Sequence, residues 1–335
     1  MAKIGVLGAG TWGTALARML CNSGHDVAVW TAIPEDCDRL NATRVHKNLP
    51  DMVIPDALVF TKDISEACAD RELIVAASPS IYLRGTIRQA KPYITAGQVI
   101  VDVAKGIEPG TLYTMTELIR DELGRDDVRL AALSGPTHAE EVAKDLPTTI
   151  VSACEDMDTA RYVQDIFTTG CMRVYTNPDI KGVELCGALK NIIALASGIA
   201  TGLGYGDNAR AALITRGIVE IARLGLKMGC MLETFSGLAG IGDLIVTATS
   251  AHSRNNRCGK LIGEGVPVQE AIRQVGMVVE GINAIPAAME LTRRMDVEMP
   301  LTAAVDSVVN GGADPAESVK KLMNRARKAE LDVGF

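Results

Sequence analysis

Hydrophobic residues in the first half of the chain gather in short runs that alternate with helical patterns. The first run, residues 3–7, leads into a glycine-rich turn and a helix predicted from residue 14 to residue 20. Later runs typical of buried strands cover residues 27–30, 58–60, 73–77, 99–103, 130–133 and 148–152. This alternation predicts a fold of the α/β class, with a doubly wound, mainly parallel sheet.

Beyond residue 178 the pattern changes to long Ala-, Leu- and Ile-rich segments with helical spacing. Helices are predicted over residues 182–204, 208–228, 255–263, 267–275, 281–295, 301–310 and 315–324. We therefore expect a nucleotide-binding domain of residues 1–181 and an all-helical domain of residues 182–335. Residues 235–247 hold too many glycines for a comfortable helix interior, so we expect a connection there, or a backbone packed closely around a site that includes Asp243.

The turn after the first run carries three glycines in a GxGxxG spacing, which is typical of a Rossmann-like dinucleotide site. Gly8 permits the turn, Gly10 lets the backbone approach a pyrophosphate, and Gly13 lets the helix pack on the strand. The phosphates would then face the helix N-terminus. The next strand ends in Thr31 and Ala32, with no acid or base directly after it, so the sequence leaves the choice between NAD and NADP open.

Composition excludes some classes of function. The formal net charge of -7 argues against general nucleic-acid binding. The eight cysteines show neither CxxC nor metal-ligand spacing, so we expect reduced thiols, no metal site and a cytoplasmic protein. The most apolar segment, residues 182–204, contains Glu184, Lys190 and Asn191. Because charges near the centre of a membrane span are costly, this segment is predicted to be a buried helix, with no insertion into a membrane.

Several predicted strands end in polar residues, where ligands of open α/β sheets bind. Ser78 follows one strand, Lys105 another, and residues 134–137 a third. In the helical half, Lys190 is the best candidate proton donor. An apolar helix would desolvate its ammonium and lower its pKa, and Asp243 could orient it; the alternative is a lysine that reaches the surface.

Residues 253–257 concentrate hydrogen-bond donors at a predicted helix start. This pattern favours either a phosphate clamp or a solvated helix N-terminus. The four histidines are dispersed along the chain, and none is chosen as a catalytic base.

Taken together and in this order, the motifs resemble the bacterial NAD(P)-dependent glycerol-3-phosphate dehydrogenases over essentially the whole chain. The resemblance is carried by residues 8–13 (GAGTWG), 104–106 (AKG), 133–137 (LSGPT), 187–191 (GALKN), 208–217 (NARAALITRG), 240–244 (GIGDL), 253–255 (SRN) and 279–281 (VEG). It implies a cytosolic enzyme of phospholipid precursor synthesis. The implied reaction is a reversible hydride transfer between NAD(P)H and dihydroxyacetone phosphate that gives sn-glycerol 3-phosphate.

The resemblance also implies roles for particular residues. Lys190 would exchange the hydroxyl proton, Lys105 would polarise the reacting oxygen, and Asp243 completes the implied catalytic set. Implied substrate contacts are Lys105, Gly135, Thr137, Lys190, Asp243, Ser253, Arg254 and Asn255. Implied cofactor contacts, with the glycine turn, are Thr11, Trp12, Lys105, Ala139, Arg254, Val278 and Glu280. Similar enzymes are dimers, and the helical half is where we expect the interface of a homodimer.

Two departures from the family pattern affect these expectations. Thr31 and Ala32 stand where an Arg or His commonly binds the 2′-phosphate of NADP, and His138 stands where an aromatic ring is common. Two alternative functions share the nucleotide-binding half. One is a β-hydroxyacid or ketopantoate-type reductase, whose substrate carries a carboxylate, and the other is a nicotinamide-sensing module without catalysis. The 253–255 cluster with Asp243 favours a phosphate substrate, and the presence of both Lys105 and Lys190 argues against a sensor.

Overall fold

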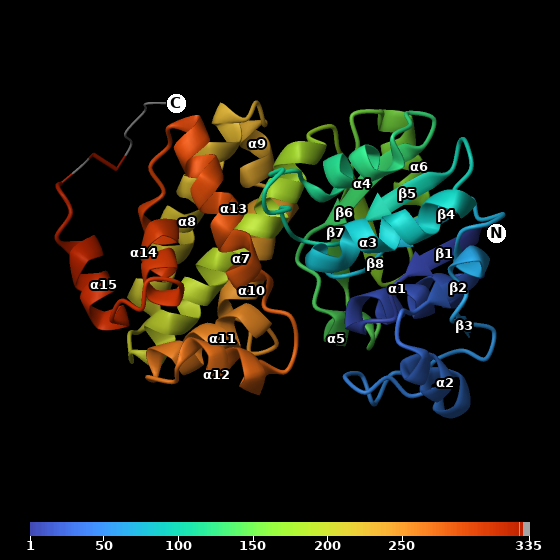
Figure 1. The fold of residues 1–335 in the computed structure, drawn as a ribbon, viewed down its shortest axis with the longest axis horizontal. Coiled ribbons are helices and arrows are strands. Elements are labelled where there is room, and N and C mark those ends of the chain that lie inside the picture. Colours follow the sequence, from blue (N-terminus) through green and yellow to red (C-terminus); the bar gives the residue numbers. More distant parts are fainter. Residues whose placement is uncertain (328, 331–335) are drawn as a thin grey trace. The chain divides into compact units, whose positions relative to one another are not determined.

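The computed structural model describes residues 1–327, 329 and 330. Residue 328 and residues 331–335, at the end of the predicted second domain, lie outside the described residues. The chain forms two compact units: residues 1–105 with 113–180, and residues 106–112 with the chain from Lys181 onward. Each unit has hydrophobic core clusters of its own, two in the first unit and one in the second. Figure 1 shows the fold.

The first unit is built on an eight-stranded sheet with the order β3-β2-β1-β4-β5-β6-β7-β8, within the described residues. Its strands are β1 (Lys3–Leu7), β2 (Asp26–Trp30), β3 (Val59–Thr61), β4 (Leu73–Ala76), β5 (Val99–Asp102), β6 (Arg129–Ser134), β7 (Thr148–Ala153) and β8 (Met172–Asn177). All neighbouring strands run parallel except β6 and β7, which are antiparallel. The predicted doubly wound, mainly parallel sheet is confirmed, with most strand bounds within a residue of prediction.

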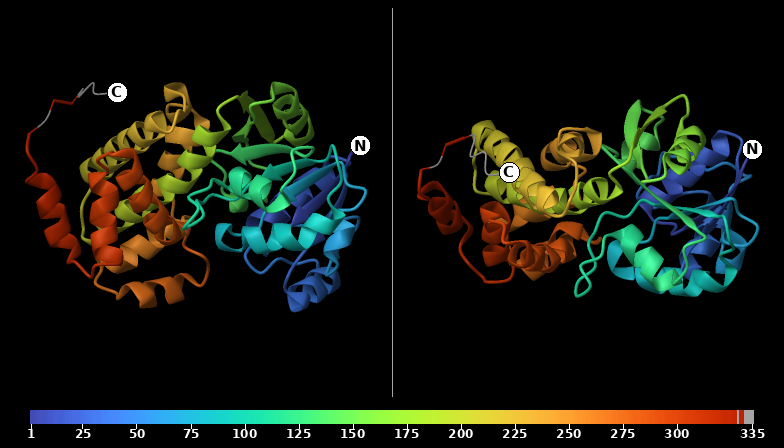
Figure 2. Two further views of the ribbon diagram at one scale, coloured as in Figure 1. Left: turned by 45° about the horizontal axis from the view of Figure 1, so that its top comes forward. Right: turned by 90° about the horizontal axis from the view of Figure 1, so that it is seen from above.

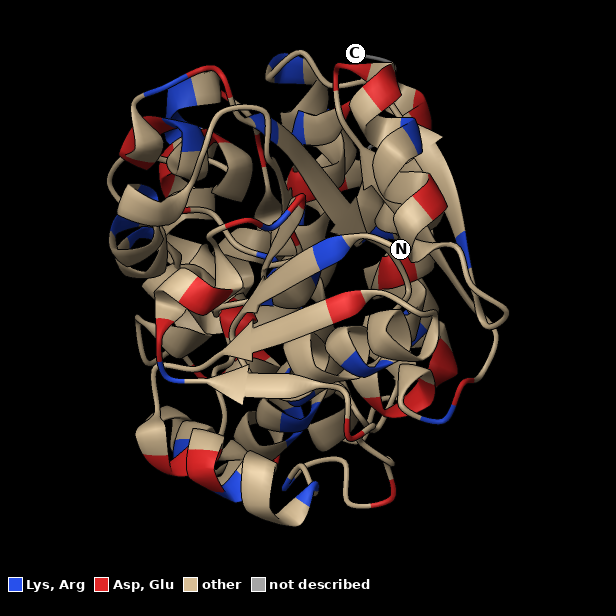
Figure 3. Ribbon diagram, turned by 90° about the vertical axis from the view of Figure 1, so that its right-hand side faces the viewer, with Lys and Arg blue, Asp and Glu red and all other residues tan. Residues whose placement is uncertain are grey.

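Helices cover both faces of this sheet (Figure 2). One core joins the sheet to α1 (Thr11–Asn22), α2 (Pro34–Thr43), α5 (Ala139–Val142) and α6 (Met157–Phe167). The other core joins it to the 3-10 turn η1 (Ile64–Ala67), α3 (Ser80–Ala90) and α4 (Met115–Leu123); a further 3-10 turn, η2 (Lys91–Tyr93), follows α3. In Figure 3 the charged residues of this unit lie mainly on helices and loops. Because helices cover both faces of the sheet, the side chains on both faces of the parallel strands are buried, and these strands are almost continuously apolar.

Strand β8 was missed from the sequence. It lies at the edge of the sheet, and its residues alternate between buried and exposed before ending half-buried. An edge strand with polar alternate positions lacks the continuous apolar run that marked the central strands.

The second unit is helical. Its elements are α7 (Ile180–Gly202), α8 (Asp207–Lys227), α9 (Leu232–Phe235), the π-type turn η3 (Leu238–Gly242), α10 (Asp243–Thr249), α11 (Arg254–Gly263), α12 (Val268–Val275), α13 (Glu280–Met295), α14 (Pro300–Val309) and α15 (Pro315–Met323). Helix α7 is long and apolar enough to cross a membrane by length and composition, yet its apolar window is entirely buried inside the structure. The prediction of a buried helix at this position is confirmed.

Of the two expectations for residues 235–247, the connection was wrong, because the structure makes this segment largely helical. The alternative, a backbone packed closely near Asp243, agrees with the packing at Gly240. The glycines allow the chain to pass from α9 through η3 into α10 by close backbone packing. A Cβ atom on Gly240 would lie 2.2 Å from the carbonyl oxygen of Phe235, and Gly240 itself departs from helical geometry with φ -90° and ψ -105°. Glycine here permits a compressed turn between two helices, an effect that helix propensity alone does not predict.

Candidate functional site

The glycine turn of the first unit has the geometry of a phosphate cradle. Gly8 has φ +130°, a conformation that favours glycine, and a Cβ atom on Gly13 would lie 2.1 Å from the Gly8 carbonyl oxygen. By contrast, the space that a Cβ on Gly10 would occupy is open. Backbone can thus be approached closely at Gly10, while Gly13 holds α1 against the turn.

Helix α1 begins directly after this turn, at Thr11. Its N-cap residue, Gly10, provides no side-chain cap, and its first turn contains no acidic residue. The N–H groups and the positive end of the helix dipole therefore suit an anion. Among the other predicted cofactor contacts, Trp12 packs partly buried against the core that contains Ala139, the first residue of α5. The residues present in this turn fit the pyrophosphate of a dinucleotide.

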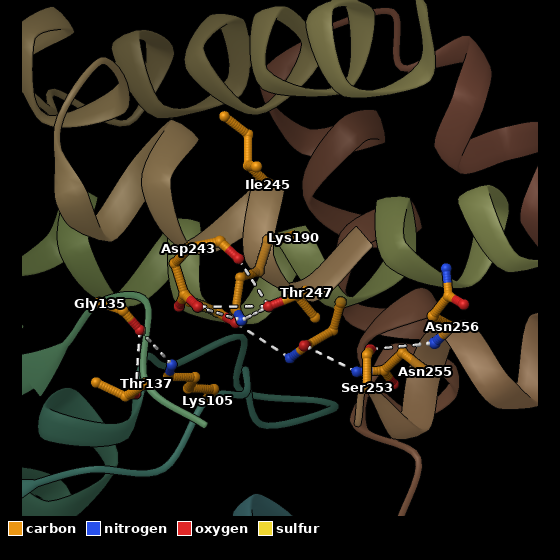
Figure 4. Close-up of polar contacts among 12 residues, drawn as sticks. Lys105, Gly135, Thr137, Lys190, Asp243, Ile245, Thr247, Ser253, Asn255 and Asn256 are labelled. Atoms are coloured by element: carbon orange, nitrogen blue, oxygen red, sulfur yellow. Dashed lines mark hydrogen bonds and ion pairs between the residues drawn. The ribbon is translucent and has the colours of Figure 1, made fainter. Parts of the chain in front are cut away.

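The carboxyl ends of neighbouring parallel strands lie on the same side of the sheet as the glycine turn. Strands β1, β4, β5 and β6 lie side by side and parallel, so the residues that follow them share one edge. Lys105 follows β5, and its Nζ donates to the carbonyl oxygen of Gly135, which follows β6, at 3.1 Å. The hydroxyl of Thr137 donates to the same carbonyl oxygen at 3.1 Å. The three predicted substrate residues of the first unit therefore form one cluster (Figure 4).

Ser78, which follows a neighbouring strand, has structural surroundings. Ser78, after β4, donates from its hydroxyl to the carbonyl oxygen of Leu7 and accepts from the hydroxyl of Thr86, each at 3.1 Å. These bonds join Thr86 of α3 to the end of β1 through Ser78, so they give the Ser78 turn a structural role.

In the second unit Lys190 is buried at the middle of α7. Its exposed fraction is 4 %, and its Nζ lies 2.7 Å from Oδ1 of Asp243. It also donates to the hydroxyl oxygen of Thr247 at 2.5 Å, and that hydroxyl donates to the Asp243 carbonyl oxygen at 2.7 Å (Figure 4). The alternative of a lysine reaching the surface is excluded, and the expected pairing of Lys190 with Asp243 is present.

Thr247 was not predicted from the sequence. It lies four residues after Asp243, one helical turn along α10, so both side chains reach the same lysine. The spacing between them was a usable signal only if the segment was recognised as a helix. The prediction of a connection at residues 235–247 removed that signal.

The predicted phosphate clamp lies at the start of α11, and its three residues have different surroundings. Ser253 is the N-cap, and its hydroxyl oxygen accepts from the Asn256 N–H at 3.2 Å. Arg254 donates from Nη1 to the carbonyl oxygen of Val278 at 3.1 Å. Two of the predicted cofactor contacts, Arg254 and Val278, are therefore neighbours in the second unit.

Asn255 is buried and joins three helices of the second unit. Its Nδ2 donates to Oδ1 of Asn191 on α7 at 2.9 Å, and its Oδ1 accepts from the Gly281 N–H on α13 at 2.8 Å. Asn191 follows Lys190 directly and was not predicted as a site residue. The predicted cofactor residue Glu280 precedes Gly281 and begins α13. These bonds fix α7, α11 and the start of α13 to one another around the site residues.

Among the described residues no group of His, Cys, Asp or Glu side chains could hold a metal ion. The second unit therefore holds a buried lysine, its carboxylate and hydroxyl partners, and an arginine at a helix start. The first unit holds a glycine cradle and a lysine that follows a neighbouring strand. Such groups can bind a dinucleotide, attract an anion and move a proton.

Comparisons with known proteins agree with this chemistry. Residues 3–160 match the model of the NAD-dependent glycerol-3-phosphate dehydrogenase N-terminus, and residues 179–320 match that of the C-terminus. The chain is 65% identical over 335 residues to glycerol-3-phosphate dehydrogenase (NAD(P)+) 2 of Lactobacillus delbrueckii subsp. bulgaricus, covering 99% of both chains.

Among solved structures, one of this family resembles the chain more closely than one that shares only its fold. The crystal structure of glycerol-3-phosphate dehydrogenase from Coxiella burnetii matches with a TM-score of 0.93 at 38% identity, covering 97% of this chain and 99% of that one. A PanE/ApbA family ketopantoate reductase from Ralstonia eutropha matches with a TM-score of 0.61 at 16% identity, covering 95% of this chain and 99% of that one. The second likeness shows a shared fold alone.

Proposed function

Because this chain belongs to the NAD-dependent glycerol-3-phosphate dehydrogenase family, we propose that it interconverts dihydroxyacetone phosphate and sn-glycerol 3-phosphate, with Lys190 moving the proton. The enzyme is an oxidoreductase that uses NAD or NADP. The observation that carries the assignment of Lys190 is its burial in an apolar helix against Asp243 and Thr247. The nicotinamide, when bound, supplies or accepts the hydride.

The surroundings of Lys190 suit proton transfer. Burial favours the neutral amine, whereas the Asp243 carboxylate favours the ammonium, so the two effects oppose each other on one group. The bonds to Asp243 and Thr247 also hold Nζ in one orientation. A lysine side chain without these bonds would lose conformational entropy on taking up that orientation. In reduction of the ketone, Nζ gives its proton to the developing alkoxide oxygen. In oxidation of the alcohol, neutral Nζ takes the proton from the hydroxyl.

We assign the remaining charges to the substrate and cofactor. Lys105, fixed by the Gly135 carbonyl oxygen, polarises the reacting oxygen, and Thr137 and Asn255 contribute contacts to the substrate. Ser253 and Arg254, at the start of α11, hold the phosphate. Arg254, together with Val278 and Glu280, would also hold the dinucleotide, and the glycine turn at Thr11 and Trp12 would hold its pyrophosphate.

The test is the initial rate of NADH or NADPH oxidation with dihydroxyacetone phosphate, compared with ketopantoate under the same conditions. We expect turnover with dihydroxyacetone phosphate and none above background with ketopantoate. Lys190→Ala should lose most of kcat while direct titration shows nearly unchanged NADH binding. Turnover of ketopantoate, or a Lys190→Ala variant with the rate of the wild type, would contradict the proposal.

The same proposal covers the setting of the reaction. We place the enzyme in the cytoplasm, where it supplies sn-glycerol 3-phosphate for phospholipid synthesis, and we propose that it works as a homodimer through its helical unit. The helical unit exposes large apolar side chains at the start of α9, Met231 and Leu232. Restored growth of a bacterial strain that lacks this activity, on medium without glycerol, tests the metabolic role.

A further inference from the structure

The segment after α2 forms a tight turn against the core of the first unit. Arg44, with φ 54°, ends α2 in a left-handed conformation. His46 and Leu49 then form an isolated bridge, in which the Leu49 N–H donates to the His46 carbonyl oxygen at 2.9 Å. Both side chains are buried. Residues 44–49, which we name the bracing turn, are therefore held in place by the core, and no motif assigned them a role.

His46 of the bracing turn contacts the glycine turn directly. The backbone of Ala9, between Gly8 and Gly10, lies against its ring and opposes the lowering of the pKa of His46 by burial. Its Nδ1 accepts from the Asn48 N–H at 3.2 Å, so the proton of the neutral ring is on Nε2. Burial lowers the pKa of His46, which keeps the ring in this neutral form.

Asn48 contacts the other side of the glycine turn. Its Nδ2 donates to the hydroxyl oxygen of Thr11, the first residue of α1, at 2.9 Å. A threonine hydroxyl has one proton to donate and can accept as well. When its oxygen accepts from Asn48, its own O–H is directed to a different acceptor. The open space at Gly10, next to Thr11, is where the pyrophosphate is proposed to lie.

We propose that Asn48 is a positioning residue for the dinucleotide: by donating to Thr11 it orients the threonine hydroxyl toward the pyrophosphate. His46 holds the bracing turn against Ala9 so that the Asn48 amide keeps this position. The inference rests on the proposed function, because it assigns the ligand of the glycine turn as a dinucleotide. It adds two residues outside the predicted site and gives Thr11 a defined role as a hydrogen-bond donor.

The first test compares Asn48→Ala with a matched control, Asn41→Ala. Asn41 is a neighbouring amide on α2 whose Nδ2 donates to the Phe60 carbonyl oxygen at 2.9 Å, away from the glycine turn. We expect Asn48→Ala to raise the Kd and KM for NADH roughly fivefold to tenfold, the effect of one hydrogen bond. The kcat and the KM for dihydroxyacetone phosphate at saturating NADH should stay unchanged. Asn41→Ala should change Tm at most.

A second variant guards against loss of folding. Asn48→Asp keeps the side-chain volume but replaces the donor with a negative charge, so it should weaken NADH binding more than Asn48→Ala. A double-mutant cycle with Thr11→Val tests the route of the effect: in the Thr11→Val background, Asn48→Ala should add little. Unchanged NADH binding in both Asn48 variants, an equal loss in Asn41→Ala, or full additivity with Thr11→Val would overturn the proposal.

Isothermal titration with NADH separates this inference from the proposed function. If the wild type binds NADH but does not reduce dihydroxyacetone phosphate, the proposed reaction fails while the Asn48 titrations still test positioning. If the wild type reduces dihydroxyacetone phosphate and the Asn48 variants bind NADH like the wild type, the positioning role alone fails.

Discussion

At the scale of single residues, Lys190 shows how a lysine can be held inside an apolar helix. An isolated buried ammonium is costly, and removing one member of a buried ion pair leaves the other uncompensated. Asp243 and Thr247 offset that cost with two short hydrogen bonds to Nζ. We conclude that this cluster constrains the lysine more strongly than stability alone requires, because an apolar residue of similar size would pack in α7 without needing partners.

Arg254 is the residue whose substitution tests the phosphate clamp. Arg254→Ala removes the proposed partner of a dianion and should raise the KM for dihydroxyacetone phosphate by roughly tenfold or more, as expected for a charge-assisted hydrogen bond. The matched control is Arg257→Ala, which removes an exposed arginine from the next turn of the same helix. Steady-state kinetics measure both. An unchanged KM in Arg254→Ala, or an equal rise in Arg257→Ala, would count against the clamp.

At the scale of elements, the sequence predicted those whose apolar pattern is unambiguous. Strands β1, β4 and β5 are buried on both faces and show as continuous apolar runs, so their positions followed from the pattern. The positions of strand β8, at the edge of the sheet, and of the helical segment around Gly240 did not follow from the apolar pattern. Their structure depends on neighbours distant in sequence or on backbone contact, such as the packing of Gly240 against Phe235, which no local pattern encodes.

The difference between local sequence patterns and contacts made by packing also explains which candidate site residues were predicted. Lys190 and Asp243 were recognisable as charges among apolar or glycine-rich neighbours. Thr247 and Asn191 are ordinary polar residues, and their roles follow only from the hydrogen bonds that packing creates. Asn48 and His46 lie more than thirty residues beyond the glycine turn, so only the fold brings them to it.

Helix α14 begins at a buried carboxylate, which makes its attachment sensitive to pH. Glu220 on α8 accepts from the N–H groups of Leu301 and Thr302, at 2.7 Å and 3.3 Å. Burial, the largest effect, raises the pKa of Glu220 to about 7, although these bonds oppose it. The folded state thus binds a proton that the unfolded state has released near its ordinary value of 4.5. The stabilising contribution is present below that value and is lost as pH rises through about 7.

Glu220→Gln tests this titration. The amide keeps an acceptor for the Leu301 N–H but cannot ionise between pH 5 and pH 8. Relative to this variant, the wild type should lose on the order of 2 kcal/mol of unfolding free energy across that interval. Urea unfolding of both proteins at pH 5, 6, 7 and 8 measures the difference and cancels the titration of other groups. A constant difference between the two proteins would show that Glu220 keeps its charge state.

At the scale of the whole molecule, the chain consists of two units of different construction. The parallel sheet of the first unit exposes a row of backbone groups and strand ends at one edge, which suits a nucleotide. The helical unit instead buries single polar side chains in α7, α10 and α11, where packing fixes their directions. Substitutions at the glycine turn should therefore change nucleotide binding first, whereas substitutions around Lys190 should change the chemical step first.

The helical unit also carries the surface on which the proposed homodimer can be tested. Met231 and Leu232 lie about half exposed at the start of α9, and large exposed apolar side chains that adjoin one another are typical of interfaces. Light scattering coupled to size exclusion should give the wild type twice the mass of one chain. Leu232→Glu should shift the equilibrium toward monomer, because a carboxylate in an interface core is costly to desolvate. Met323→Glu, at an exposed methionine on α15, is the control and should stay dimeric. A monomeric wild type would reject the dimer, and a dimeric Leu232→Glu would move the interface to another face of the helical unit.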